Sequence, residues 1–463
     1  MKTLLLHLAC LMACALSGAP TVERMAFSGK EDGRIKIKYV LTEPAVVTLK
    51  LFRNGTEPVD ECAYRDVSGA VNRLVPPGRR TIVWDCPTDF DFGDPARFRA
   101  ELRAWRTDAP PPYMVVHLTN SPVTVSYYAS TNAFPLGFGH DYYKTCGLTL
   151  RKIPVANETF ERGPQPVQQT VFGASDWAAD KAAGKQRVRL TSDYYIGVYE
   201  YTYGNDASVD GMPEDGTRWP GDDARPADSR TYPLLNRSYS ACRDGGDGET
   251  TGWPAKGHEI ADAKTVVGRL NAHTGMAFDL PTEAQWWRAC YGDGTVPFYN
   301  GQGDGSDLGV ADGRYYHTGI SAYAWTMANS RTDEGRWLPH PVGLKRPNAY
   351  GLYDMLGNVH EWVLDGAAGR WDGYYSESGV EVSVDPSGCP KPGLFDADSS
   401  STWLRTLVGG SYAHAPSSAH VNFRYRNSCS YASNGGDTSV RDGAKAEMWC
   451  QGLRVVCPAV VVK

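Results

Sequence analysis

One segment, residues 348–362 (NAYGLYDMLGNVHEW), constrains the fold of this chain more than any other. It combines turn-forming residues, aromatic side chains and two carboxylates within a short stretch. Gly357 and Asn358 permit a tight backbone path, and Asp354 and Glu361 can supply the hard anionic oxygens that Ca²⁺ prefers. We therefore expect a turn held together by a metal ion, although an ordinary Gly/Asn turn beside a core tryptophan gives the same pattern.

The composition indicates a loop-rich globular protein. The chain has 463 residues, including 49 glycines and 30 prolines, and this length suits about two or three domains. Charged residues make up 22% and the net charge is −6, which argues against a nucleic-acid partner because such proteins normally carry a basic face. No apolar run after the N-terminus approaches the ~20 residues of a membrane helix, so we expect no transmembrane segment.

Residues 1–19 have the pattern of an export signal. Lys2 gives a short basic start, residues 4–15 are mostly apolar, and residues 15–17 are small enough for cleavage. We therefore expect an extracytoplasmic protein, either secreted or periplasmic. Residues 11–14 (LMAC) also loosely resemble a lipoprotein box, in which Cys14 becomes a lipid anchor, so lipidation and ordinary cleavage both stay open.

Cysteine usage agrees with an oxidising compartment. Two of the 11 cysteines lie in the leader, which leaves an odd number in the mature chain and at least one thiol without an intramolecular disulfide. Cys62 and Cys86 are the only pair near the N-terminus and are candidates for a disulfide there. The sequence does not determine connectivity; free thiols are the simpler interpretation of three further cysteines, namely Cys146, Cys242 and Cys290.

Residues 20–108 are predicted to form a small all-β sandwich of the immunoglobulin or fibronectin type. Short segments with period-two patterning are separated by turn residues such as Asn54-Gly55 and Pro76-Pro77-Gly78. The expected strands include residues 34–40, 45–52, 81–84 and 98–105. A proline run at 110–112 marks the exit, and residues 109–147 are interpreted as a linker or bridge.

Residues 148–460 are predicted to form a loop-rich α+β domain with few helices. One helix is expected over 262–274, ending at Gly275. A second begins at Thr282, which forms a capping box with Gln285. The buried faces of these helices are expected to carry Val266, Val267, Leu270, Trp286, Ala289 and Cys290. Three acidic, glycine-rich stretches, 204–216, 244–251 and 301–313, are interpreted as solvated loops.

Five segments occur in an order that resembles the sulfatase-modifying factor family, the formylglycine-generating enzymes. They are LRKIP at 150–154, DYYIGVYEYT at 193–202, LPTEAQW at 280–286, the 348–362 segment, and VGGSY at 408–412 followed by GLR at 452–454. This resemblance implies a C-type-lectin-like fold for the second domain.

The resemblance also implies a copper site, and here the chain departs from the family pattern. Family enzymes hold Cu(I) with two cysteine thiolates, soft ligands that suit this soft ion. The first of these cysteines falls on His414, and the second on Ala419 or on Asn422, depending on the anchor used. Ser411 matches an active-site serine of the family. A working copper site is therefore not expected, although His414 and His420 together could hold a borderline metal.

A calcium site carries over from the family more completely. It maps to the side chains of Asp354 and Glu361 and to the carbonyl groups of Gly357 and Val359. All four can serve as ligands, so we expect structural Ca²⁺ at this turn.

These residues favour an exported family member that is catalytically silent and acts as a calcium-stabilised binding module, with a protein or peptide as its ligand. Two alternatives stay open: a family enzyme with altered chemistry, and a formylglycine-generating oxidase that acts on a sulfatase cysteine.

Overall fold

A computed structural model describes residues 19–29, 34–53, 56–59, 65–85, 98–163, 186–210, 228–244, 262–292, 308–311, 314–333, 335–366, 382–386, 404–428 and 450–461. The chain divides into two compact units, and in the described residues the boundary falls between Ala109 and Pro110. The leader residues 1–18, with Cys14, lie outside the described residues.

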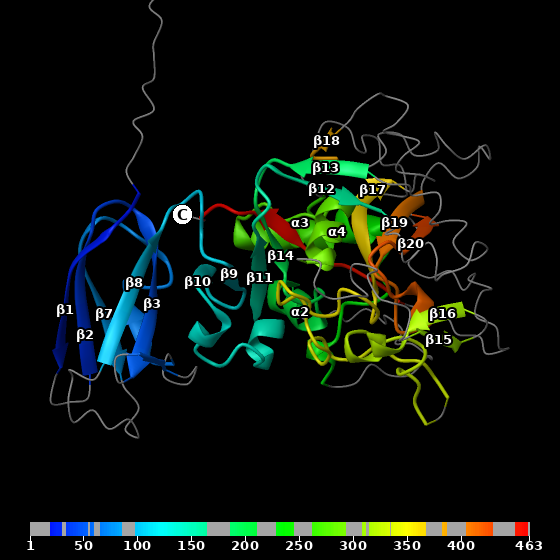
Figure 1. Cartoon of the computed structure of the whole chain (residues 1–463), viewed down its shortest axis with the longest axis horizontal. Coiled ribbons are helices and arrows are strands. Elements are labelled where there is room, and N and C mark those ends of the chain that lie inside the picture. The colour runs from blue at the N-terminus through cyan, green and yellow to red at the C-terminus, as the bar shows by residue number, and fades with distance from the viewer. Residues whose placement is uncertain are drawn as a thin grey trace, which may run out of the picture. The chain divides into compact units, whose positions relative to one another are not determined.

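The described helices and strands of the N-terminal unit are all β-strands, arranged in two antiparallel sheets (Figure 1). One sheet has the order β1 (Val22–Gly29), β2 (Arg34–Leu41), β7 (Gly78–Asp85) and β5 (Val67–Gly69). In the other, β3 (Ala45–Arg53) pairs with β4 (Glu57–Pro58), β6 (Leu74–Val75) and β8 (Phe98–Trp105). The four segments with period-two patterning therefore all form strands.

Alternating burial explains why these segments are strands. Along β2, Ile35, Ile37, Tyr39 and Leu41 are buried, while the residues between them are exposed or half-buried. Such alternation matches the two faces of a sheet that is covered on one side.

The second unit is built from several small sheets with few helices, as the α+β expectation predicted (Figure 1). Its largest sheet is antiparallel and runs β10 (Thr124–Tyr128), β9 (Tyr113–His117), β11 (Gly147–Ile153), β14 (Tyr194–Gly197), β22 (Val456–Pro458). A second sheet runs β12 (Glu158–Arg162), β13 (Gln186–Leu190), β18 (Ser383–Val384). A third, which carries the candidate site, runs β20 (Arg424–Ser428), β19 (Leu404–Val408), β17 (His360–Gly366), β21 (Gln451–Gly452).

The helices in the described part of this unit are short. They are α2 (Tyr203–Asp210), α3 (Val266–Thr274) and α4 (Glu283–Tyr291), with single helical turns at Thr131–Ala133, Asp141–Lys144, Ser229–Thr231, Ser240–Asp244, Thr318–Ala322 and Pro416–Ser418. Helix α3 ends at Gly275 in the left-handed conformation, and α4 begins with the predicted Thr282–Gln285 capping box. All six residues predicted for the buried faces of α3 and α4 are buried.

Several boundaries differ from the expectations. Helix α3 begins at Val266 rather than at 262, because Thr265 caps it by accepting a hydrogen bond from the Gly268 N–H. Helix α2 and the hairpin of β15 (Leu308–Ala311) with β16 (Arg314–His317) lie partly in stretches that were expected to be loops. Residues 109–147 contain β9 and β10, two strands of the largest sheet, rather than only a connecting bridge.

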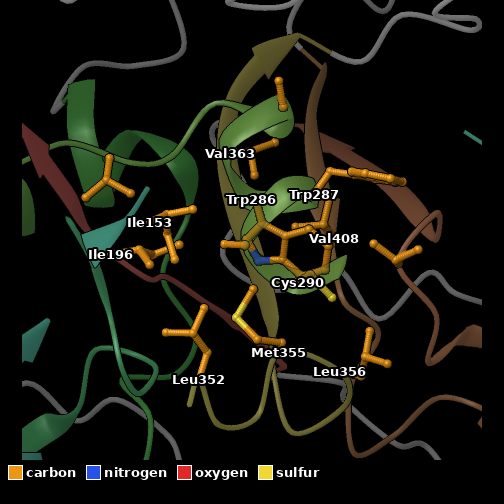
Figure 2. Packing of buried hydrophobic residues seen from close by; sticks show 14 of the residues in the cluster. Ile153, Ile196, Trp286, Trp287, Cys290, Leu352, Met355, Leu356, Val363 and Val408 are labelled. Carbon is orange, nitrogen blue, oxygen red and sulfur yellow. The ribbon is translucent and has the colours of Figure 1, made fainter. Parts of the chain in front are cut away.

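The core of the second unit surrounds α4. Figure 2 shows the Trp286 ring amid side chains from β11, β14, β17 and β19 and from the segment at 352–356. Trp287 stacks between Phe160 (ring centroids 5.7 Å apart) and Tyr291 (4.6 Å). The signature segment, residues 348–362, is therefore packed directly against α4, the helix that begins within the LPTEAQW motif.

Five cysteines lie within the described residues, and all are free thiols: Cys146, Cys242, Cys290, Cys450 and Cys457. This agrees with the free-thiol interpretation of the first three. Cys62, Cys86 and Cys429 lie outside the described residues, so the Cys62–Cys86 disulfide stays a prediction. No helix in the described part of the chain is long and apolar enough to cross a membrane.

Candidate functional site

The signature segment forms a turn that leads into β17. Asp354, Gly357 and Asn358 all have positive φ angles, of 54°, 76° and 53°. At Gly357 the turn passes so close to a neighbouring loop that an added Cβ would lie 2.2 Å from the Trp325 carbonyl oxygen. The Gly357 N–H donates to the Gly409 carbonyl (2.8 Å) and the Asn358 N–H to the Trp325 carbonyl (2.9 Å). Glycine is thus required at 357 by both conformation and space.

Asp354 lies fully buried at this turn. Its Oδ2 accepts a hydrogen bond from the Gly343 N–H (2.6 Å), whereas its Oδ1 has no hydrogen-bond partner among the described residues. Burial, with a smaller contribution from the negative charge of Glu361, raises the pKa of Asp354 to about 6, against the opposing effects of the Gly343 hydrogen bond, Arg454 and Lys144. A buried carboxylate oxygen without a partner is costly and marks a position where a cation fits.

Glu361 is held by two other side chains. Its Oε1 accepts from Arg454 Nη2 (2.8 Å) and Nε (3.0 Å), and its Oε2 accepts from Trp286 Nε1 (2.7 Å). These contacts join the signature segment, the GLR segment and helix α4, three of the motifs that were quoted separately. Any cation at this turn must therefore share Glu361 with Arg454.

Sequence reasoning missed a third carboxylate, Glu200. It accepts hydrogen bonds from Asn358 Nδ2 (2.6 Å) and from the Val359 N–H (3.0 Å). Burial, and then the charges of Asp354 and Glu361, raise the pKa of Glu200 well above its usual value. Glu200 lies in the DYYIGVYEYT motif, which was the sequence signal that could have identified it. Its hydrogen-bond partner Asn358, however, lies 158 positions away in the chain.

The charges of this cluster support a divalent cation. Glu200, Asp354 and Glu361 are all about 1% exposed or less, and the Arg454 guanidinium forms an ion pair with Glu361 (2.8 Å). Burial raises the pKa values of Glu200 and Asp354, and the neighbouring negative charges add to this effect. The donor set of carboxylate oxygens at a tight turn suits Ca²⁺. The structure thus brings Asp354, Gly357, Val359 and Glu361 together around one turn.

The residues expected at the copper site lie next to this turn, after Gly409 and Gly410. Ser411 Oγ lies 2.6 Å from His414 Nδ1. Ala419 carries no donor, and Asn422 Oδ1 accepts a hydrogen bond from Trp287 Nε1 (2.8 Å). The paired thiolates of the family are therefore absent from these positions.

His414 instead lies beside two residues that sequence reasoning did not select. His360 Nε2 is 3.4 Å from His414 Nε2, and the thiol of Cys450 lies in the same group, with the three ligand atoms within 4.8 Å of one another. His420, the partner suggested by the sequence, is not in this group; burial lowers the pKa of His420 to about 3. The signal for His360 was its position in the signature segment.

A family model described as the sulfatase-modifying factor enzyme 1-like domain matches residues 159–436, more than half of the chain. The chain belongs to this family. The family assignment made from the ordered motifs is thereby confirmed.

Known relatives match over part of their length. A formylglycine-generating enzyme of Mycobacterium tuberculosis is 29% identical over 153 residues, covering 32% of this chain and 43% of that protein. One of Streptomyces coelicolor is 32% identical over 143 residues, covering 29% of this chain and 35% of that protein. The chain therefore aligns with less than half of each of these relatives.

Two solved structures are similar in outline. Treponema denticola variable protein 1 has 21% identity and a TM-score of 0.38, covering 67% of this chain and 95% of that chain. PvdO from Pseudomonas aeruginosa has 18% identity and a TM-score of 0.39, covering 67% and 94%.

Proposed function

We propose that this protein is an exported member of the sulfatase-modifying factor family that does not form formylglycine and acts as a calcium-stabilised binding module for a protein or peptide. One observation carries the proposal: His414 and either Ala419 or Asn422 occupy the positions where the family has its copper-binding cysteines. In the family, two thiolates supply the anionic, soft field of the reactive Cu(I) site, and a neutral imidazole at position 414 does not reproduce that pair.

The remaining features support export and binding. The export-signal pattern at 1–19 and the nine cysteines that follow it favour an oxidising compartment. A C-type-lectin-like domain with long loops, preceded by an immunoglobulin- or fibronectin-like sandwich, suits recognition of a protein surface. The family-matched region supplies the binding surface in this proposal.

The first test is an aldehyde assay with a Cys-x-Pro-x-Arg peptide, copper and O₂. We expect no aldehyde above background, while a formylglycine-generating enzyme assayed in parallel converts the peptide. Aldehyde formation by this protein would refute the proposal and favour the oxidase alternative.

A second test concerns the cation at the signature turn. A ligand that binds only the folded state adds about 2.7 kcal/mol to the free energy of unfolding at a hundredfold excess over Kd. We therefore expect that a calcium chelator lowers the melting temperature of the second unit. The effect should be restored by Ca²⁺ and not by Mg²⁺, which demands a stricter octahedral geometry.

Variants connect this response to the turn. Asp354→Ala removes the oxygen without a partner and should abolish the response to chelator, even if it also lowers the starting melting temperature. Asp206→Ala is the matched control, because Asp206 of α2 is also buried but pairs with Arg269 of α3 (3.1 Å). A melting temperature of the unmodified protein that ignores the chelator would remove calcium from the proposal.

A second candidate function is a family enzyme with altered chemistry. The observation that favours it is the buried group of His360, His414 and Cys450, which offers a donor set unlike that of the family. Turnover of a substrate other than the sulfatase-type peptide would distinguish this candidate from a binding module.

A further inference from the structure

Three potential metal ligands from distant parts of the sequence meet beside the signature turn. His360 begins β17, His414 lies in the turn after Gly409 and Gly410, and Cys450 directly precedes β21. Their relative exposures are 1%, 9% and 3%. Their three ligand atoms all lie within 4.8 Å of one another. Among the described residues, no other group of three or more His, Cys, Asp or Glu side chains meets this criterion.

The backbone fixes all three segments. The His360 N–H donates to the Cys450 carbonyl (2.7 Å), and β17 pairs in parallel with β21 from His360 onward. On the other side, the Tyr412 N–H donates to the Asn358 carbonyl (2.7 Å) and the Met327 N–H to the His414 carbonyl (2.9 Å). The ligands are therefore positioned by the sheet and its adjoining turns rather than by flexible loops.

The distance between the imidazoles fits a shared ion. Two nitrogens bound at ~2.0–2.1 Å in trigonal or tetrahedral geometry lie ~3.3–3.6 Å apart, and His360 Nε2 and His414 Nε2 are 3.4 Å apart. A plain hydrogen bond between these atoms is the alternative, but its usual length is about 2.9–3.0 Å. The Cys450 thiol lies within 4.8 Å of both nitrogens, and a small movement would bring its sulfur to a metal bond of about 2.3 Å.

Ser411 provides the outer support that metal-binding histidines usually have. Its Oγ lies 2.6 Å from His414 Nδ1. With the proton on Nδ1 donated to this oxygen, the lone pair of Nε2 points to the shared position, which is the arrangement seen at protein metal sites. This gives Ser411 a positioning role for the His414 ring.

Aromatic rings enclose the group. The His360 ring lies nearly parallel to Phe423 (centroids 5.7 Å apart, 11°) and to Tyr425 (5.5 Å, 11°). Cys450 packs in a small cluster with Tyr412, Ala413 and Trp337. Such surroundings exclude water and strengthen the bond between a cation and a thiolate.

We propose that His360, His414 and Cys450 form a binding site for one copper or zinc ion. Two imidazoles and one thiolate are too soft for Ca²⁺ or Mg²⁺, which prefer oxygen ligands. Three protein ligands suit trigonal copper, whereas zinc takes a fourth ligand such as water. This metal site is an addition to the proposed binding function and does not depend on catalysis. Its ligands are different residues from Glu200, Asp354 and Glu361.

The experiment measures metal content and spectra of the full-length protein. After purification from medium supplemented with copper or zinc, we expect about one equivalent of one of these ions. Co²⁺ serves as a spectroscopic probe for the zinc-type site, and we expect a thiolate-to-cobalt charge-transfer band in the near ultraviolet. Competition between Cu(I), Zn²⁺ and Co²⁺ then identifies the preferred ion.

Substitutions assign the ligands. Cys450→Ser should abolish the charge-transfer band, and His360→Gln and His414→Gln should each release most of the metal. Ser411→Ala should weaken binding by roughly tenfold to a hundredfold, as loss of an outer-sphere partner does. The matched controls are Cys146→Ser and His420→Gln, which lie outside the group and should retain both metal and band.

Each outcome decides the proposal. Metal without a thiolate band in the unmodified protein would overturn it, as would a band that survives Cys450→Ser or disappears in Cys146→Ser. Failure to bind copper or zinc would also overturn it and would leave the aldehyde and calcium tests unaffected. If Cys450→Ser does not fold, as judged by circular dichroism, the cobalt spectrum of the unmodified protein and the two histidine variants decide.

Discussion

Several carboxyl groups are buried in the second unit, and Asp365 illustrates how burial of such a group makes the stability of the fold depend on pH. Asp365 lies in β17, 1% exposed, and its Oδ2 accepts a hydrogen bond from the Glu283 N–H (2.6 Å). Burial raises the pKa of Asp365 to about 7; the Glu283 charge adds to this, while Arg162 and Arg424 oppose it. The folded protein therefore keeps a proton on Asp365 at pH values where the unfolded chain has lost it.

The raised pKa of Asp365 predicts that the free energy of unfolding depends on pH, and that Asp365→Asn removes this contribution because an amide does not titrate. The unfolded carboxyl titrates near pH 3.9, so the stabilising effect of protonation is complete below this pH and is lost as pH rises through the folded value of about 7. Asp365→Asn should therefore become progressively more stable than the unmodified protein between about pH 4 and 7, by at most on the order of 4 kcal/mol. Urea unfolding across this range measures the difference, and a difference that does not change with pH would contradict the assignment.

The candidate site could be located from the sequence, but not completed. Glycine, asparagine and two carboxylates within one short segment were enough to select Asp354 and Glu361. Glu200 and Arg454 could not be selected, because their partners Asn358 and Glu361 lie 158 and 93 positions away in the chain. Cys450 could not be selected, because it meets His360 and His414 only in the folded structure. Residues that are close in the sequence determine the geometry of a turn. The balance of buried charges and the arrangement of metal ligands depend on segments that come together only in the fold.

At the scale of elements, local chemistry predicted the helices that have recognised end signals. The capping box of α4 and the glycine at the end of α3 both follow from residue type and position. Helix α2 was missed, although Thr202 and Asn205 form reciprocal hydrogen bonds at its start, from Asn205 N–H to Thr202 Oγ1 and from Thr202 N–H to Asn205 Oδ1. Asparagine replaces the usual Glu or Gln of this motif, so the signal was present in a form that the rule does not include.

Helix α3 provides a prediction in which packing opposes helix propensity. Gly268 lies inside the helix, and replacing an interior glycine with alanine normally stabilises by about 1 kcal/mol. Here an added Cβ would lie 1.8 Å from the Asp262 carbonyl oxygen, which already accepts hydrogen bonds from the Thr265 N–H (2.9 Å) and hydroxyl (2.6 Å). Gly268→Ala should therefore lower the free energy of unfolding by about 1–3 kcal/mol through overpacking.

The exposed Ala272 in the same helix is the control for propensity. Ala272→Gly should cost about 1 kcal/mol, so both exchanges destabilise although they run in opposite directions. Thermal or denaturant unfolding of the two variants checks this. A stabilised Gly268→Ala would show that the segment at 262–265 moves aside easily.

At the scale of the whole molecule, the two units have different sources of stability. The N-terminal unit depends on apolar strand residues such as Ile37, Val47 and Trp84, each at most 1% exposed. The second unit combines an apolar core with buried charges at the signature turn. A cation bound at this turn, as proposed above, should therefore affect the stability of the second unit directly, whereas the N-terminal unit offers no comparable group of ligands among its described residues.

This difference predicts how fragments behave. Residues 20–109 should fold alone, because the strands of both N-terminal sheets lie within this range, and a chain of about 90 residues can bury enough surface for an independent domain. We expect dispersed amide resonances and one cooperative unfolding transition that does not respond to a calcium chelator. The full chain should show that transition together with a second one that does respond, and fragment 110–463 should show only the second. Collapsed amide dispersion in fragment 20–109 would mean that this unit needs the rest of the chain to fold, and a chelator effect on its transition would place a cation site outside the signature turn.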